Sequence, residues 1–462
     1  MNPLIFREYD IRGKAEEDLP NDVVYKIGQS FGTYLLNRGV KETLIARDMR
    51  LSSERIRDAI SEGLLSTGCD IIDLGLIPTP VLYFSLFHYN KNSGVMITAS
   101  HNPKEYNGFK LCYNRLSVYG EEIQNLKGII ERGDFVKGNG KITALNPIPD
   151  YIRFLREKVE IRSGLRVVLD PGNGAVGVLL DKLLEGIGIE PVIINLEPDG
   201  NFPSHLPDPT VEEYLRDLRS LVLKMDADLG IGYDGDGDRI GVIDEKGRII
   251  YGDRLLGVFA KDVIRKNPKA KIIFDVKCSM GLIEYIKSLG GIPVMYKTGH
   301  SLIKAKLKEE GAPLAGEMSG HIFFADDYFG YDDAIYASLR LLEILSHEQK
   351  PLSELVGEIP HYYSTPEIRI ECPDEIKFEV VENLKEELSS KYEIIGIDGV
   401  RIIFPDGWGL VRASNTQPAL VLRFEAKEEK RLEEIKEFIL HRLRRHLKGQ
   451  STLDGEGLKG LS

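Results

Sequence analysis

A repeated unit spans the first three quarters of the chain and restricts its possible folds more than any other feature. Each copy reads as a strand, a helix, a glycine and a second strand, followed later by a strand that runs into a polar loop. The glycines are Gly68, Gly188 and Gly290, which stand where helices are expected to end. Alternating helices and strands with short connections indicate layered α/β domains with mostly parallel strand pairing. We therefore expect three similar mixed α/β sandwich domains.

The last quarter of the chain has a different order of predicted strands and helices. A strand at residues 367–370 leads to a helix at 377–391, and three further strands and an amphipathic helix follow. This pattern predicts a smaller α+β domain, which would complete one central cleft with the other three. The tail contains glycines, Ser, Thr and charges without periodicity, which is typical of a disordered segment. The expected domains and tail are residues 1–150, 151–253, 254–367, 368–447 and 448–462.

The composition is that of a large enzyme rather than a membrane or nucleic-acid-binding protein. The chain has 462 residues, of which 42% are apolar, and no apolar stretch reaches the roughly 20 residues that span a bilayer. Its net charge of -12 disfavours nucleic acid and anionic membranes as partners. The N-terminus lacks the features of a signal peptide, and the four cysteines are too far apart for a zinc site. We expect reduced thiols and a cytoplasmic location.

An acidic run follows an apolar stretch at residues 229–232 and supplies the first candidate for chemistry. Asp234, Asp236 and Asp238 alternate with glycines, so a tight loop can direct several hard oxygens at one cation such as Mg²⁺ or Ca²⁺. With Glu245 the three also match an EF-hand at positions one, three, five and twelve. Arg239 stands where that motif needs glycine, and the strand-like residues 240–243 also argue against it. A solvated acidic turn is the plainer alternative.

A second polar loop, Thr98-Ala99-Ser100-His101-Asn102-Pro103, follows the apolar residues 95–97. Both loops are therefore expected at the carboxyl ends of strands, where ligands bind in α/β sheets. Most serines in such a context only satisfy turn hydrogen bonds. His101 is adjacent to Ser100, and adjacent side chains do not readily form a nucleophile–base pair, which argues against a hydrolase triad.

The loop at residues 98–103 and the run Asp234-Gly235-Asp236-Gly237-Asp238-Arg239 together resemble the α-D-phosphohexomutase superfamily, and the phosphomannomutase/phosphoglucomutase family within it. The resemblance implies that Ser100 carries a phosphoryl group and ligates Mg²⁺ together with the three aspartates. It also implies a catalytic set around them. That set comprises Ser100, Arg12, His101, Lys110 and Arg239.

Three further segments resemble substrate-binding parts of the same family. Gly316-Glu317-Met318-Ser319-Gly320-His321 resembles its sugar loop, residues 6–13 its N-terminal entrance, and residues 412–418 its phosphate-binding loop, in which Gln417 replaces the usual Glu. A surface or helix-to-strand turn is the alternative for each. The residues implied to bind substrate are Tyr9, Lys277, His300, Glu317, Ser319, His321, Arg412, Ser414, Asn415 and Thr416.

The resemblance implies reversible interconversion of hexose 1-phosphate and hexose 6-phosphate, with mannose or glucose as the sugar. Phospho-Ser100 would donate to the sugar, and a hexose 1,6-bisphosphate, which also serves as activator, would turn over in the cleft. Arg12, Lys110, His300 and His321 are candidates for the acid and base. The fourth domain would rotate to loosen the cleft.

Other functions stay open at this point. A phosphoglucosamine mutase is the nearest alternative, although glucosamine-specific relatives generally have Gln at the position of Met318. A phosphatase and a non-catalytic, metal-dependent sugar-phosphate-binding protein are alternatives of other classes. The expected partners are small sugar phosphates, with a homo-oligomer possible. Because the chain is acidic, its phosphate-binding cleft would need local cations.

Overall fold

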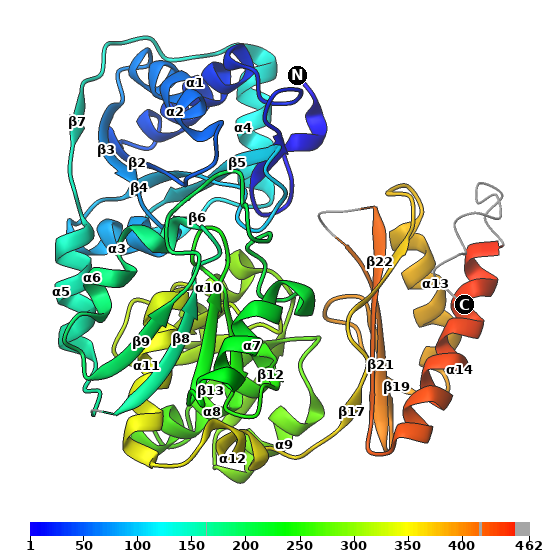
Figure 1. Cartoon of the computed structure of the whole chain (residues 1–462). Helices are drawn as coiled ribbons and strands as arrows, with labels where there is room; N and C mark the ends of the chain where they lie inside the picture. The colour runs from blue at the N-terminus through cyan, green and yellow to red at the C-terminus, as the bar shows by residue number, and fades with distance from the viewer. Residues whose placement is uncertain (163, 415–417, 449–462) are drawn as a thin grey trace.

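The computed structural model describes residues 1–162, 164–414 and 418–448. It confirms the predicted fold class, because three α/β domains precede a smaller α+β domain (Figure 1). The boundaries near residues 150, 253 and 367 stay predictions. The predicted tail from residue 449 onward and residues 415–417 of the phosphate-binding loop lie outside the described residues.

The first domain is built on a mixed seven-stranded sheet with the order β1-β5-β4-β2-β3-β7, in which β6 pairs with β5. Alternate residues face opposite layers, as the strand period of two requires. Ile45 packs toward α1, α2 and α4, whereas its neighbours Leu44 and Ala46 face α3 and the domains beyond it. The elements are η1 Pro3–Ile5, β1 Ile11–Lys14, α1 Asn21–Leu36, β2 Glu42–Arg47, α2 Ser53–Leu65, β3 Asp70–Leu76, α3 Thr79–His88, β4 Ser93–Ile97, β5 Tyr106–Tyr113, β6 Leu116–Ser117, α4 Glu121–Arg132 and β7 Ile142–Ala144.

The second domain has the strand order β12-β11-β10-β8-β9. Val168 and Ile243 face α7 on one side of the sheet, while Val167 and Leu169 join a core on the other side. The elements are α5 Ile148–Lys158, β8 Leu165–Asp170, η2 Ala175–Val178, α6 Leu180–Leu184, β9 Ile189–Ile193, η3 Glu212–Leu215, α7 Arg216–Lys224, β10 Leu229–Tyr233, β11 Ile240–Asp244 and β12 Ile249–Ile250.

The third domain repeats this layering around the sheet β14-β13-β15-β16. Gly68, Gly188 and Gly290, which mark the repeated unit, all adopt positive φ, at 94°, 88° and 81°. The elements are α8 Gly252–Lys266, β13 Lys271–Asp275, α9 Met280–Ser288, β14 Ile292–Tyr296, α10 His300–Glu310, β15 Leu314–Gly316, β16 Ile322–Phe324, α11 Ala334–Glu348 and α12 Leu352–Gly357.

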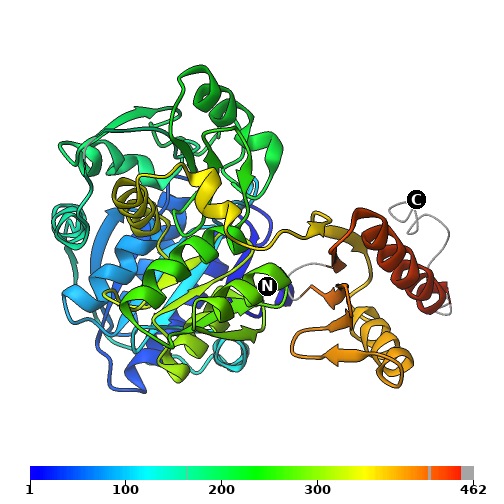
Figure 2. The same ribbon diagram turned by 90° about the horizontal axis from the view of Figure 1, so that it is seen from below.

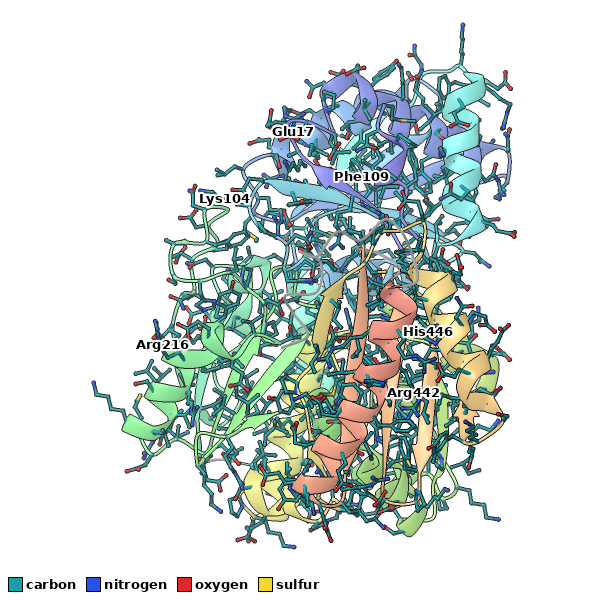
Figure 3. The ribbon with its side chains drawn as sticks, turned by 90° about the vertical axis from the view of Figure 1, so that its right-hand side faces the viewer. Glu17, Lys104, Phe109, Arg216, Arg442 and His446 are labelled. Carbon is teal, nitrogen blue, oxygen red and sulfur yellow. The ribbon has the colours of Figure 1, made fainter. Side chains whose placement is uncertain are left out.

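The C-terminal domain is an antiparallel sheet, β17-β22-β21-β20-β19 with β18 beside β22, that α13 and α14 cover on one face (Figures 1 and 3). It has its own apolar core, whereas one continuous core extends through the three α/β domains. In Figure 2 a single segment of chain leads into it from α12. The elements are β17 Tyr363–Ser364, β18 Ile368–Glu371, α13 Lys377–Ser389, β19 Glu393–Ile395, β20 Val400–Phe404, β21 Gly407–Ala413, β22 Ala419–Ala426 and α14 Glu429–Lys448.

The other face of this sheet contacts the third domain. Trp408 and Leu410 pack with Val276, and the Arg401 guanidinium lies 3.6 Å from the centre of the Trp408 ring. Arg401 donates to the carbonyls of Val276 and Cys278, at 2.5 and 3.0 Å. The patch around Arg401 is thus one of the contacts that attach the C-terminal domain, besides the linking segment. Within the described residues, no helix has both the length and the apolar character needed to span a membrane.

Candidate active site

The three loops that end the repeated units occupy equivalent places in the three sheets. The Ser100 loop joins β4 to β5, the Asp234 loop joins β10 to β11, and the Glu317 loop joins β15 to β16. Each of these strand pairs is antiparallel, so each loop turns the chain back at the edge where its first strand ends. The pairing of β11 with β10 rules out the EF-hand, which would require a helix after the acidic loop.

Ser100 is buried and held in a constrained backbone conformation. Its φ of 50° lies in the left-handed region, and its amide donates to Thr98 Oγ1 at 2.9 Å. Its Oγ donates to Asp234 Oδ2 at 2.5 Å and lies 3.1 Å from His101 Nδ1. Ser100 Oγ and His101 Nδ1 thus lie within hydrogen-bond distance, but the hydroxyl proton of Ser100 goes to Asp234 and His101 does not accept it. Burial and the nearby cations Arg239 and Arg12 hold the pKa of His101 well below its usual range.

The three aspartates are fully buried, so the solvated-turn alternative was also wrong. Asp234 Oδ1 accepts from the backbone amides of residues 237, 238 and 239 at 3.0 to 3.1 Å, which fixes the loop. Lys110 Nζ donates to Asp236 Oδ2 at 2.6 Å and also to Asp238 Oδ2. Burial alone would lower the pKa of Lys110, but the carboxylates of Asp236 and Asp238 outweigh it and raise that pKa.

These carboxylates fit a divalent cation. Oxygens of Asp234, Asp236 and Asp238 lie within 4.8 Å of one another. Asp236 Oδ1 and Asp238 Oδ1 are buried without a hydrogen-bond partner, although each of these carboxylates is held through its other oxygen. Buried, oriented and unsatisfied carboxylate oxygens are the donor set that Mg²⁺ takes in proteins.

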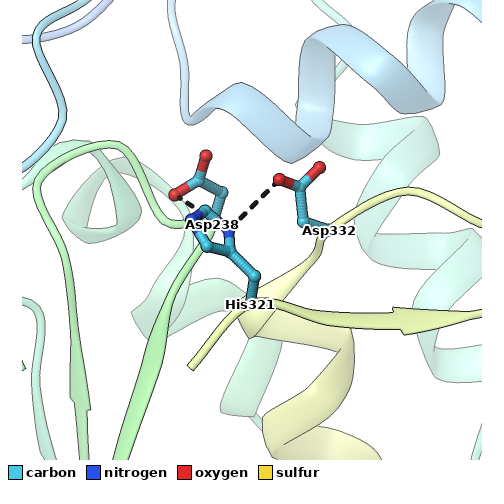
Figure 4. Close-up of side chains that lie close together, drawn as sticks. All are labelled: Asp238, His321 and Asp332. Carbon is cyan, nitrogen blue, oxygen red and sulfur yellow. Dashed lines mark ion pairs between the residues drawn. The ribbon is translucent and has the colours of Figure 1, made fainter. Parts of the chain in front are cut away.

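His321 connects the Asp234 loop to the Glu317 loop, on which it lies. Arg239 Nε donates to His321 Nε2 at 2.9 Å, so the ring proton of a neutral His321 stands on Nδ1. That Nδ1 lies 3.2 Å from Asp332 Oδ2 and 3.7 Å from Asp238 Oδ1, as the dashed lines in Figure 4 mark. Asp332 Oδ2 also lies 3.3 Å from His300 Nδ1. One buried carboxylate thus orients both histidines.

The sugar loop and the N-terminal segment meet at residues 298–299. Glu317 Oε1 accepts from the Gly299 amide at 2.6 Å, and Tyr9 OH donates to the Thr298 carbonyl at 3.0 Å. Burial raises the pKa of Glu317. Gly299 has a φ of 135°, and a Cβ there would lie 2.7 Å from the Tyr9 ring, so the close approach requires glycine. Arg12 donates to Asn102 Oδ1 at 2.9 Å and reaches the Ser100 loop.

The C-terminal domain contributes a cationic end to the site. Arg412 is almost fully buried and pairs through Nε with Asp398 Oδ2 at 3.0 Å. The same Asp398 oxygen accepts from the Thr298 amide at 3.0 Å, so Arg412 is tied to the third domain. Lys277 pairs with Glu367 at 3.1 Å across the same boundary.

One cavity of about 400 Å³ contains these groups. Its cations outnumber its carboxylates, which meets the need for a local cationic cleft in an acidic chain. Asp234 and Asp236 lie behind its wall, and Asn415 and Thr416 lie outside the described residues. The sequence-predicted residues that line it are Tyr9, Arg12, Ser100, His101, Lys110, Asp238, Arg239, Lys277, His300, Glu317, Ser319, His321, Arg412 and Ser414.

Sequence analysis missed the group that holds the Ser100 loop in place. Arg50 is buried, pairs through Nε with Asp48 Oδ2 at 3.2 Å, and donates to four backbone carbonyls of that loop. Its Nη2 reaches the carbonyls of Ser100 and Asn102 at 2.7 and 2.6 Å, and its Nη1 those of residues 103 and 106 at 2.7 and 3.0 Å. Asp332, which orients the histidines, was missed as well. For Arg50, the local signal in the sequence was the nearby carboxylate in Asp48-Met49-Arg50.

Met318, which was expected to bear on sugar choice, turns its sulfur away from the cavity. Its Sδ lies 2.8 Å from Nη1 of Arg423, on the sheet of the C-terminal domain. Glu317 and Ser319 on either side of it line the cavity. The Met318 side chain therefore belongs to the interface between the third and fourth domains rather than to the cavity wall.

Four family models match consecutive parts of the chain. They describe the phosphoglucomutase/phosphomannomutase alpha/beta/alpha domain I at residues 3–137, domain II at 149–247, domain III at 251–363 and the C-terminal domain at 367–442. Together they account for most of its length.

Individual relatives match over nearly the whole chain. A phosphomannomutase/phosphoglucomutase of Pseudomonas aeruginosa is 47% identical, with 95% of each chain covered. A phosphoglucomutase of Neisseria gonorrhoeae is 44% identical over 93% of this chain and 95% of its own. The crystal structure of a phosphoglucomutase/phosphomannomutase family protein from Burkholderia thailandensis has a TM-score of 0.91 at 39% identity, covering 98% of this chain and 99% of that one.

Proposed function

Because this chain belongs to the phosphoglucomutase/phosphomannomutase family, we propose that it is an isomerase that moves a phosphoryl group between O1 and O6 of glucose and mannose. The observation that carries the proposal is the meeting of four chain segments in one cavity. Ser100, the metal loop, the sugar loop and Arg412 come from the four different domains and line or support the same space.

The proposed cycle begins with phospho-Ser100. The O6 hydroxyl of a hexose 1-phosphate attacks the phosphorus, the bond from phosphorus to Ser100 Oγ breaks, and the O6 proton leaves to a base. The resulting hexose 1,6-bisphosphate turns over within the cavity. Ser100 Oγ then attacks the 1-phosphate, the bond from phosphorus to O1 breaks, and hexose 6-phosphate is released. Phosphorus returns to Ser100 each time, so no phosphate is lost to water.

The protein groups supply position and charge, which dominate catalysis of phosphoryl transfer. Asp234, Asp236 and Asp238, together with Ser100, would hold Mg²⁺, which supplies charge stabilisation for the transferring phosphoryl oxygens when bound. Arg239 and Lys110 add fixed positive charge beside Ser100. Which of Arg12, Lys110, His300 and His321 acts as acid and base stays a prediction.

The far end of the cavity would hold the phosphate that is not being transferred. Arg412 supplies a guanidinium that is already oriented by Asp398, and Ser414 lies beside it in the cavity wall. Glu317 and Ser319 line the same cavity and would bind hexose hydroxyls in either orientation. Because glucose and mannose differ only at the 2-hydroxyl, contacts to the 3- and 4-hydroxyls accept both.

Steady-state assays with glucose 1-phosphate, mannose 1-phosphate and glucosamine 1-phosphate test the proposal, with Mg²⁺ and a hexose 1,6-bisphosphate activator present. We expect comparable kcat/KM for the two hexoses and a lower value for glucosamine 1-phosphate. A higher value for glucosamine 1-phosphate would favour the phosphoglucosamine mutase. Release of inorganic phosphate as fast as substrate disappears would favour a phosphatase.

Intact-protein mass separates a mutase from a non-catalytic binding protein. We expect one stable phosphate on the wild-type chain, absent in Ser100→Ala, and no turnover in that variant. Full turnover by Ser100→Ala would contradict the phosphoserine route. The hexose 1,6-bisphosphate activator, the cytoplasmic location and a homo-oligomer stay predictions.

A further inference from the structure

A second cavity lies between the first and third domains, behind the wall of the active site. The turn after β5 and strand β6 form one side of it and helix α10 another, and these two elements lie side by side (Figure 1). Its volume is about 640 Å³, larger than that of the cavity with Ser100 and within the range of about 300–1,000 Å³ that small-molecule sites occupy.

Aromatic rings form one side of this cavity. Phe87 from α3 stacks on Phe329 with ring centres 4.7 Å apart, and Tyr83 lies against Tyr331 at 5.4 Å. Arg115 lies over the Phe87 ring at 5.6 Å and Lys304 over the Tyr83 ring at 4.3 Å, so rings and cations form one continuous lining. Aromatic surface of this kind binds another planar ring by burial of apolar area and by contact with ring edges. The residues come from the first and third domains, so the shape of the cavity depends on how these domains pack.

The charged groups of the cavity all have one sign. Arg115, Lys304 and Lys308 line it, and no carboxylate does among the described residues. The imbalance is notable because Asp and Glu outnumber Lys and Arg in the chain, 72 to 60. Lys308 is exposed at the end of α10 and has no ion-pair partner in the described part of the chain. A cavity with aromatic faces and cations selects a planar ring that carries an anionic group.

Lys304 connects this cavity to the active site. Its Nζ donates to Tyr83 OH at 3.2 Å and to Asp332 Oδ1 at 3.0 Å. The other oxygen of Asp332 faces Nδ1 of His300 and Nδ1 of His321, and both histidines line the cavity with Ser100. Figure 4 shows the contact between Asp332 and His321. Asp332 lines neither cavity itself, but it links Lys304 of the one to His300 and His321 of the other. An anion beside Lys304 competes with Asp332 for the ammonium group. It thereby changes the electrostatic interaction between Asp332 and the two histidines.

We propose that this cavity is a regulatory site for a small ligand with a planar ring and an anionic group, and that its occupation slows turnover through Lys304 and Asp332. Nucleoside monophosphates and aryl carboxylates share this chemistry. Binding at the site is independent of the proposed mutase activity, whereas the effect on turnover rests on it. By linkage, any change that the ligand makes in hexose-phosphate affinity is matched by an equal effect of hexose phosphate on the ligand.

Calorimetric titration tests binding, with glucose 1,6-bisphosphate saturating the active site. The probes are adenosine 5′-monophosphate and 2-naphthoate, which separate the two sources. Adenosine and inorganic phosphate each lack one of the two features. We expect at least one of the ring-bearing anions to bind, and adenosine and phosphate to bind at least about tenfold more weakly. Failure of both ring-bearing anions to bind at millimolar concentration would overturn the site.

Two charge-reversal variants locate the site. Lys308→Glu changes an exposed lysine of the cavity and Lys287→Glu changes an exposed lysine of α9 outside it. We expect Lys308→Glu to weaken binding at least about tenfold and Lys287→Glu to leave it unchanged. If both variants bind the probe equally, or if glucose 1,6-bisphosphate displaces the probe, then the probe binds at another site and the proposal is overturned.

Turnover of glucose 1-phosphate tests the coupling. We expect the bound probe to lower kcat of the wild type and of Lys287→Glu, while Lys308→Glu keeps its basal kcat and resists inhibition. Binding without any effect on kcat or KM would overturn the regulatory role and leave the mutase proposal untouched. Lack of turnover in the unliganded wild type would instead refute the mutase proposal.

Discussion

Arg50 is the residue whose replacement tests most directly how the fold prepares Ser100. Its guanidinium gathers four carbonyls of the loop that carries Ser100 and pairs with the buried carboxylate of Asp48. Neither group contacts the proposed substrate through its side chain, so any effect on catalysis must pass through the position of the loop. The perturbation is Arg50→Met, which keeps an apolar stem of similar length and removes the fork.

The magnitude follows from burial. Both charged side chains are inaccessible to solvent, so Arg50→Met leaves the carboxylate of Asp48 without its ionic partner in the interior. Removal of one member of a buried pair costs about 3–5 kcal/mol of folding free energy. The loop carbonyls also lose their donors. A shift of reacting groups by about 1 Å costs on the order of 100-fold in rate. We expect Arg50→Met to lower the free energy of unfolding by about 3–5 kcal/mol and to lower kcat about 100-fold.

Denaturant unfolding and steady-state kinetics separate the two effects when Arg50→Lys and the double variant Asp48→Asn/Arg50→Met are included. Lysine keeps a cation beside Asp48 but cannot reach four carbonyls, so stability should recover more than kcat. The double variant removes the uncompensated charge, so it should be more stable than Arg50→Met and still slow. A kcat within about threefold of wild type in Arg50→Met would refute the reasoning, because the loop would then hold Ser100 without the clamp.

Three further changes have defined outcomes. Asp236→Asn removes one carboxylate ligand, and we expect calorimetry to show Mg²⁺ binding at least about tenfold weaker; unchanged affinity would remove Asp236 from the metal site. Arg401→Met removes the hydrogen bonds to the carbonyls of Val276 and Cys278 that help attach the C-terminal domain to the third domain, so the KM for glucose 1-phosphate should rise about tenfold with a smaller fall in kcat, and the reverse pattern would contradict this. His205 faces Asp170 Oδ2 at 3.0 Å and, although burial opposes it, this partner raises the pKa of His205 above 6.5. The stabilising contribution of protonated His205 is therefore complete below pH 6.5 and is lost as the pH rises through the folded-state pKa. The difference in unfolding free energy between wild type and His205→Gln should therefore shrink from about pH 5.5 to about pH 8.5. A difference that stays constant over this range would contradict the assignment.

The sequence alone was enough to predict those parts of the site that are formed by residues close together in the chain. Asp234, Asp236 and Asp238 alternate with glycines after an apolar strand, and that spacing is enough to predict a loop of converging carboxylates. Ser100 and Glu317 could be placed because each follows a strand of the repeated unit. Strand and helix periodicity depends on neighbours a few positions apart, which is why the α/β repeat and the C-terminal α+β domain were both predicted correctly.

Some features of the site were missed because they depended on backbone conformation or on distant partners. The sequence argued only that adjacent Ser100 and His101 do not readily form a nucleophile–base pair, and it did not predict that Ser100, with its left-handed φ, has its Oγ 3.1 Å from His101 Nδ1 and donates to Asp234. Arg50 lies fifty residues from Ser100, and the nearby Asp48 alone does not distinguish a buried clamp from an exposed arginine. Met318 stands within the sugar-loop motif, yet its sulfur faces Arg423.

The sequence by itself thus predicted a set of site residues, most of which line one cavity, and the tertiary structure decided how they are coupled. Asp332 is not part of any quoted motif, yet it lies between Lys304 and the histidines at 300 and 321 because α10 and the segment before α11 pack together. Lys110 pairs with two aspartates more than a hundred positions away. Such contacts arise from the packing of whole domains, whose burial of apolar area depends on the full set of long-range neighbours rather than on spacing along the chain.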